Sequence, residues 1–387
     1  MRLVHLTPLY ERPGPWASVC VGVPHAGHAA DGAETAEAAE AGPGERELAA
    51  REICRELGRQ GVDAATGRAV HEALTEWPGA AGAAGRAIYA THGEVVLDPP
   101  LTAAPGTPEI HWASLPRVAP LLDLAVQEPV CLVAYVDRTG ADLELRGPLG
   151  SRPAGEAEGK DWPLYRTAAA DWSERHFPMH VENSWDENTW EENASQVAAA
   201  LVLCQEETRA DLIVLVCGDR ERRAVTQRLP QPLRPLTVAA EHGGPARGPG
   251  ARLPDEEIER ARRAHLRRIE RTELDRYRAA GAPTAEGLPA LVVAAREHRI
   301  AELLVRPEGP DPRREVWVGP EPDQIAVDRG DTRYFGEEHA PEPGRADDAL
   351  LRSAAVNGAE VLRVHPAPGS GDRGVPAGGL GALLRRP

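Results

Sequence analysis

Residues 181–223, VENSWDENTWEENASQVAAALVLCQEETRADLIVLVCGDRERR, decide the fold of this chain. In the first half, apolar residues recur at the three- and four-residue spacing that places them on one face of a helix. In the second half, residues 212–217 form an unbroken, β-favouring apolar run that ends at a charged turn. The stretch therefore predicts one helix-to-strand unit of an α/β sheet. The apolar helical face consists of Val197, Ala200, Leu201 and Cys204.

The neighbouring segments predict further elements of the same sheet. A strand is expected at 130–136, and the turn DRTGAD returns the chain into residues 143–145. After the central strand, residues 218–229 predict a turn and a second helix, and residues 236–241 a third strand. A long polar excursion, residues 147–178, separates the first strand pair from the helix.

The rest of the chain predicts two further domains. The amino-terminal part predicts an acidic loop at 24–44, a helix at 45–57 ended by Gly58, a hairpin at 86–97 around His92 and Gly93, and a proline-rich connection at 99–120. From Gly287 to residue 364 the pattern is helix, strand, polar insert, helix and strand. Because 387 residues exceed what one core usually supports, we expect domains at 1–120, 121–250 and 251–387.

Residues 254–280 predict a long helix with eight arginines and seven acidic residues, so its net charge is only +1. Two interpretations are open for this helix. It is either a solvated helix laced by ion pairs four residues apart, which we favour, or an RNA-binding helix.

The charge and the composition of the chain limit the kinds of partner that it can bind. The net charge of −16 repels a bare polyphosphate, so we expect no DNA partner, and any RNA must be met through local basic patches or through a partner protein. No apolar run approaches the roughly 18 residues of a membrane span, and the amino terminus lacks a signal-peptide pattern. We expect a cytoplasmic protein that binds no membrane.

No metal or cofactor site is predicted. The five cysteines include no CxxC pair, and Cys131, Cys204 and Cys217 lie in apolar patterns that indicate core packing. The turn after residue 217 lacks GxGxxG and GxxxxGK, which argues against nucleotide binding. His176 and His180 precede an acid-rich helix start, where helix capping is favoured over a metal or acid-base site.

Several pieces of the chain form a recognisable series: CLVAYVDRTGADLEL (131–145), His176 with Phe177, WEENASQVAAAL (190–201), ADLIVLVCGDRE (210–221), GLPALVVAAREHRIAELLV (287–305), DDALLRSAAVNGAEVLRV (347–364) and GLGALLRR (379–386). In this order and spacing they resemble the bacterial branch of the archaeo-eukaryotic release-factor superfamily, in particular Balon-type, mycobacterial-type relatives of ribosome hibernation factors. The first 80 residues match poorly.

The resemblance implies a multi-domain α/β fold: a divergent amino-terminal α/β domain, a central ribonuclease-H-like domain and a carboxyl-terminal α/β sandwich like that of ribosomal proteins. It also implies binding in the ribosomal A site during hibernation or stress. In relatives this involves large-subunit RNA and elongation factor Tu.

The catalytic loop of release factors is missing. Such factors need a Gly-Gly-Gln loop, and this chain has no GGQ and no glutamine within 147–178. We therefore expect no catalytic residue and a binder that does not release peptide. Two alternatives stay open: a peptidyl-tRNA hydrolase with a substitute catalytic loop, and a paralogue that acts only as a protein-binding module.

Two sets of residues are candidates for contact with ribosomal RNA. In the excursion, arginine and lysine side chains could bind phosphates and aromatic rings could stack on bases, although a loop that packs its aromatics on its own sheet explains them equally well. The second set follows the central strand, where ordinary helix-surface arginines are the alternative. The first set is Arg152, Lys160, Trp162, Tyr165, Arg166, Arg175 and His176, and the second is Arg220, Arg222 and Arg223.

Overall fold

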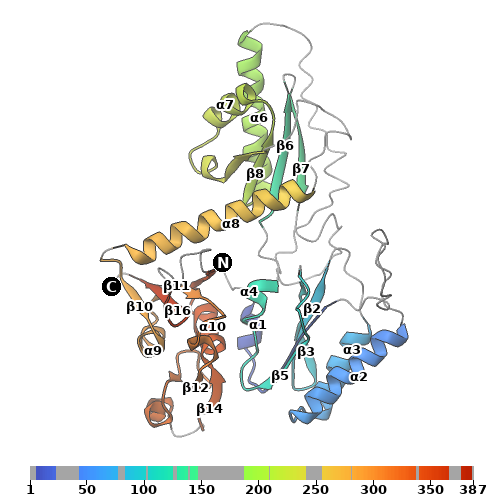
Figure 1. Cartoon of the computed structure of the whole chain (residues 1–387), viewed down its shortest axis with the longest axis vertical. Coiled ribbons are helices and arrows are strands. Elements are labelled where there is room, and N and C mark those ends of the chain that lie inside the picture. The colour runs from blue at the N-terminus through green and yellow to red at the C-terminus, as the bar shows by residue number, and fades with distance from the viewer. Residues whose placement is uncertain are drawn as a thin grey trace. The chain divides into compact units, whose positions relative to one another are not determined.

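The computed structural model divides the chain into two compact units. Unit 1 joins residues 1–127 to residues 270–387, and unit 2 comprises residues 128–269. Figure 1 labels their helices and strands. The structure describes residues 6–22, 43–76, 83–101, 103–124, 129–137, 140–146, 187–208, 210–240, 255–279, 281–336, 340–365 and 376–385.

The predicted α/β class is confirmed, because helices alternate with the strands of several sheets. The three domains expected from the sequence stay a prediction. Within the described ranges, no helix combines the length and the apolar character needed to cross a membrane.

Unit 2 is built on one four-stranded sheet in the order β7-β6-β8-β9. β6 and β7 form an antiparallel hairpin, whereas β6, β8 and β9 run parallel. Parallel neighbours need crossover connections, and helices α6 and α7 lie in them. The bounds are β6 Cys131–Asp137, β7 Gly140–Arg146, α6 Glu187–Thr208, β8 Leu212–Val216, α7 Asp219–Arg228 and β9 Thr237–Ala239.

Helices cover both faces of this sheet. Alternate residues of β6 point to opposite faces: Leu132 packs with α6 and α7, and Val133 packs with Ile258 of α8 (Asp255–Arg278). Burial on both faces explains why residues 212–217 are apolar without alternation. The helix-to-strand unit predicted from the sequence is therefore confirmed.

The amino-terminal part of unit 1 contains an antiparallel sheet in the order β3-β2-β1-β5, with β4 paired to β2. Helices α2 and α3 pack on one of its faces. The bounds are α1 Thr7–Tyr10, β1 Trp16–Gly22, α2 Pro43–Arg59, α3 Ala64–Thr75, β2 Gly85–Thr91, β3 Glu94–Leu97, β4 Pro100–Leu101, β5 Glu109–Ala113 and α4 Leu121–Leu124.

The hairpin predicted here is confirmed, and two other expectations are corrected. His92 and Gly93 both have positive φ, 49° and 81°, as a tight hairpin turn between β2 and β3 requires. The helix predicted to end at Gly58 continues through it to Arg59, and Gly61 (φ 94°) follows its end. The proline-rich connection contains strand β5, which pairs with the distant β1, a partner that local sequence does not reveal.

The carboxyl-terminal part of unit 1 holds a second sheet in the order β10-β16-β11-β15. β11 and β15 are parallel, and α10 lies between them in the chain. The predicted polar insert contains a small sheet in the order β13-β12-β14. The bounds are β10 Thr284–Glu286, α9 Leu288–Arg296, β11 Ile300–Val305, β12 Glu315–Val318, β13 Ile325–Ala326, β14 Glu342–Arg345, α10 Ala346–Val356, β15 Glu360–Arg363 and β16 Leu380–Leu384.

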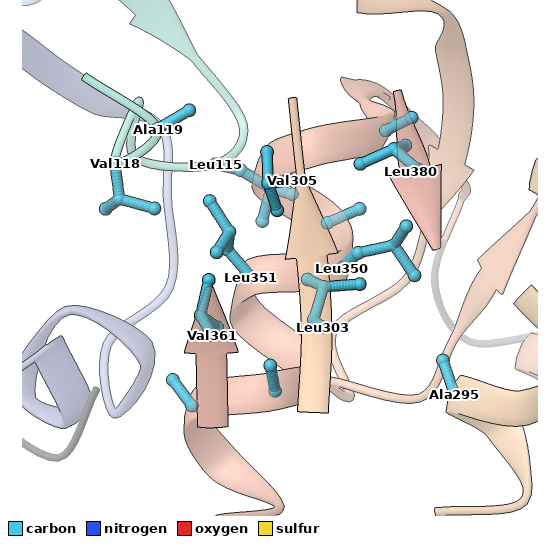
Figure 2. Packing of buried hydrophobic residues seen from close by; sticks show 14 of the residues in the cluster. Leu115, Val118, Ala119, Ala295, Leu303, Val305, Leu350, Leu351, Val361 and Leu380 are labelled. Carbon is cyan, nitrogen blue, oxygen red and sulfur yellow. The ribbon is translucent and has the colours of Figure 1, made fainter. Parts of the chain in front are cut away.

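The two ends of the chain share one hydrophobic core in unit 1. Figure 2 shows Leu115 and Val118, which precede α4, beside Leu351 of α10 and Val361 of β15. All four side chains are buried. The amino- and carboxyl-terminal segments therefore stabilise one another, although more than 140 residues of unit 2 separate them in the sequence.

Candidate functional site

The candidate site that the structure describes begins where β8 meets α7. The five residues of β8 are buried, and Gly218 caps the helix in an extended conformation (φ −69°, ψ 166°). Val225 and Leu229 anchor α7 in the core of unit 2. Arg228 joins α7 to α6, because its Nε donates to Ser195 Oγ at 2.9 Å. The first turn of α7 is thus held at the carboxyl edge of the parallel strands, where α/β proteins tend to bind ligands.

The structure separates the three arginines predicted at this edge. Arg220 and Arg223 are exposed and lie three residues apart, on one face of α7. Arg222 is partly buried, and its Nη2 lies 2.7 Å from Asp219 Oδ1. Arg223 makes no hydrogen bond or ion pair with any residue that the structure describes. Arg223, with Arg220 beside it, is therefore the best placed of the three to meet a phosphate.

The remaining predicted residues lie outside the described residues. They are Arg152, Lys160, Trp162, Tyr165, Arg166, Arg175 and His176. Their role in RNA contact stays a prediction from the sequence.

The first half of α8 carries a buried arginine that sequence reasoning missed. Arg262 Nη2 donates to the carbonyl of Arg146 at 2.9 Å, and its Nε approaches Cys131 Sγ at 3.4 Å. Glu259, one turn earlier, forms an ion pair with the same guanidinium. Arg262 thereby fixes α8 to the β6–β7 hairpin. In the sequence, Arg262 stands among other arginines of the same helix, and nothing distinguishes it from those that are exposed.

The cysteines of unit 2 behave as packing residues. Cys131 and Cys204 are buried, which confirms the core role predicted for them. Cys217 is partly exposed, and burial of its thiol raises its pKa to about 11. Only a small fraction is therefore thiolate at neutral pH, which makes Cys217 a poor nucleophile.

Comparison with known proteins finds a matching family for part of the chain and similar proteins for most of it. Residues 130–283 match the family described as Bacterial archaeo-eukaryotic release factor family 2. Two Mycobacterium tuberculosis proteins, MT2704 of strain CDC 1551 and Rv2629 of strain H37Rv, are each 28% identical over 351 residues, which is 88% of this chain and 88% of each relative.

Solved structures give more distant likenesses. Ribosome-bound archaeal Pelota has a TM-score of 0.39 at 13% identity and covers 99% of this chain and 94% of its own. Saccharomyces cerevisiae Dom34 has a TM-score of 0.34 at 11% identity and covers 66% of this chain and 64% of its own. TM-scores below 0.5 do not establish a common fold.

The family match covers the whole sheet of unit 2 and all of α8, and so contains the site around α7. It also contains the excursion and four of the pieces on which the resemblance was based. The resemblance of the chain to the bacterial archaeo-eukaryotic release-factor family is thereby confirmed. The part that matches family 2 is residues 130–283.

Proposed function

We propose that this chain binds the ribosome in the A site, in hibernation or stress, and does so without releasing peptide. The observation that carries the proposal is the release-factor family match over residues 130–283, in a chain without the GGQ sequence. A release-factor-like chain without the Gly-Gly-Gln loop can still bind the ribosome, but it lacks the groups that position the attacking water. In this proposal its partners are large-subunit RNA and elongation factor Tu.

The exposed arginines of α7 support the proposal. In a chain of net charge −16, contact with RNA must be local, because the overall charge repels phosphate. Arg220 and Arg223 present two guanidinium groups on one exposed face of a helix anchored in the sheet. Guanidinium groups bind phosphate oxygens through paired hydrogen bonds. This face is the proposed α7 contact with ribosomal RNA.

Sedimentation through a sucrose gradient tests ribosome binding. The tagged full chain should migrate with ribosomes at low salt and dissociate as salt rises, because charge-assisted contacts are screened. The variant R220Q/R222Q/R223Q should dissociate at lower salt. A chain that stays at the top of the gradient at every salt concentration would contradict the proposal and favour the protein-binding paralogue.

The matched control for this variant lies on α2. Arg51, Arg55 and Arg59 are exposed and spaced four residues apart, and Arg51 and Arg59 already pair with Glu47 and Glu56, each at 2.8 Å. R51Q/R55Q/R59Q removes the same charge and should leave sedimentation unchanged.

A single-turnover assay separates the binder from the hydrolase alternative. Purified chain is added to ribosomes that carry labelled peptidyl-tRNA, and released peptide is measured beside a GGQ release factor. We expect release at the background rate. Release as fast as that of the GGQ factor would establish a substitute catalytic loop and overturn the non-catalytic part of the proposal.

A further inference from the structure

The first half of helix α8 distributes its charged side chains unevenly around its axis. Glu257 is buried, and Glu259 is paired with the buried Arg262. Further along α8, ion pairs join residues three apart, Glu273 with Arg276 and Asp275 with Arg278. The small net charge of this helix therefore conceals a local imbalance in its first half, where Glu259 pairs with the buried Arg262.

Three arginines form what we call the outer stripe: Arg260, Arg263 and Arg267. All three are exposed, and spacings of three and four residues place them on one face of the helix. Arg263 Nε donates to the carbonyl of Glu259 at 3.2 Å, a contact that leaves its charge uncompensated. Arg267 makes no hydrogen bond or ion pair with any described residue. Glu256 is exposed one turn before Arg260, so the positive charge is centred on Arg263 and Arg267.

The opposite face of α8 is fixed to the sheet of unit 2. Ile258 packs among the residues of β6 and β8, and Arg262 donates a hydrogen bond to the backbone carbonyl of Arg146. Arg268 Nη2 donates to the carbonyl of Pro235 at 2.5 Å and contacts His265 Nδ1 at 3.0 Å. The outer stripe is therefore presented by a helix that is already ordered, which lowers the entropy lost when it binds a ligand.

We propose that the outer stripe binds the phosphate backbone of RNA. Its arginines follow one another at about 4.5 and 6 Å along the helix axis, since each residue rises about 1.5 Å. Neighbouring guanidinium groups can therefore bind neighbouring phosphates of one strand, each through paired hydrogen bonds. The inference rests on the proposed function, because it assigns an RNA contact to a second surface of the ribosome-binding chain.

Fluorescence anisotropy with a labelled RNA hairpin of about 16 base pairs tests the stripe apart from the ribosome. The full chain is compared with R260Q/R263Q/R267Q over a series of salt concentrations. Loss of three phosphate contacts should weaken binding on the order of 100-fold at about 0.1 M salt and reduce the slope of log K against log salt by about 2 to 3. The melting temperature should not change, because the three side chains are exposed. R51Q/R55Q/R59Q serves as the charge-matched control.

The possible outcomes separate the inference from the proposed function. An affinity and slope equal to those of the unchanged chain would overturn the inference, and so would an equal loss in the control, which would reflect net charge alone. If the stripe variant lost ribosomes and kept the hairpin, the stripe would contact a ribosomal protein and the RNA assignment would be wrong. If the unchanged chain bound the hairpin through the stripe and did not sediment with ribosomes, the proposed function would fail and the inference would stand.

Discussion

Arg117 donates from Nη1 to Asp347 Oδ2 at 2.9 Å, across 230 positions of the chain. The same nitrogen lies 3.1 Å from Asp348, whose Oδ1 also accepts the backbone amides of Val118 and Ala119. The side chains of Asp347 and Asp348 are 1% and 4% exposed. The first turn of α10 is thus joined to the segment before α4 by a buried charge network within unit 1.

Removal of this arginine should destabilise unit 1 strongly. Arg117→Ala removes the hydrogen-bonded arginine of the buried Asp348 and leaves it the looser contact with Arg345 Nε at 4.0 Å. Breaking a buried pair in this way costs about 3 to 5 kcal/mol. Urea unfolding followed by circular dichroism measures the loss. The control is Arg12→Ala, which breaks an exposed pair with Glu94 and should leave the unfolding midpoint unchanged. Equal midpoints for the two variants would show that the network does not contribute to stability.

The stability of unit 1 should fall as pH rises from acid toward neutrality. Glu302 of β11 is buried, and burial, followed by repulsion from the Glu273 carboxylate of α8, raises its pKa to about 7, although Arg276 lies 3.8 Å away. Because the folded state binds this proton more tightly than the unfolded state, its contribution is complete below about pH 4.5 and is lost by about pH 7. The loss amounts to at most about 3 kcal/mol for a shift of this size, because solvent screens part of the interaction.

Glu302→Gln isolates this contribution from other titrating groups. Glutamine stays neutral and can donate to the Glu273 carboxylate, so the variant should be more stable than the unchanged chain at pH 8 and should show a flatter dependence on pH. Unfolding free energies at pH 5 and pH 8 check this. Parallel pH profiles for the two proteins would exclude Glu302 as the titrating group.

Gly379 should tolerate no side chain. Its φ is 95°, and an added Cβ would lie 2.8 Å from the carbonyl oxygen of Arg306 and 2.8 Å from Cα of Gly309. Gly379→Ala should therefore cost about 2 to 4 kcal/mol from backbone strain and steric overlap together. Gly281 has a similar φ of 79° with nothing within 4 Å, so Gly281→Ala should cost only about 1 kcal/mol. Thermal unfolding of both variants measures the loss of stability. Equal losses would show that steric overlap at Gly379 adds nothing to the cost of backbone strain.

The excursion should contribute to ribosome affinity if its aromatic side chains stack on bases. Replacing Lys160, Trp162, Tyr165 and Arg166 by alanine should then weaken binding by several kcal/mol, since each stacked base contributes on the order of 1 to 3 kcal/mol. Binding and melting temperature are measured on one preparation. A loss of stability with unchanged ribosome binding would show that the rings pack on the protein itself and would remove the loop from the candidate sites.

Local features of the fold were predictable because they depend on neighbours in sequence. The apolar run at 212–217 and the helical spacing before it predict β8 and α6, and the structure has both. The hairpin at His92 and Gly93 was equally predictable from the alternating residues on both sides of a glycine, and histidine is among the residues enriched at positive φ. Strand β5 was not, since its pairing with β1 joins segments about 90 residues apart and the prolines around it indicate a loop.

Sequence alone determined the release-factor resemblance, the missing Gly-Gly-Gln and the periodicity of α8, because each depends only on the order of residues along the chain. Only the tertiary structure decided which arginines of α8 are buried and which form the outer stripe. Arg262 and Arg263 are adjacent and chemically identical, yet one donates to Arg146 beneath the helix and the other faces solvent. The helical repeat sets the angle between them, but the sheet on which α8 packs determines which side of the helix faces inward.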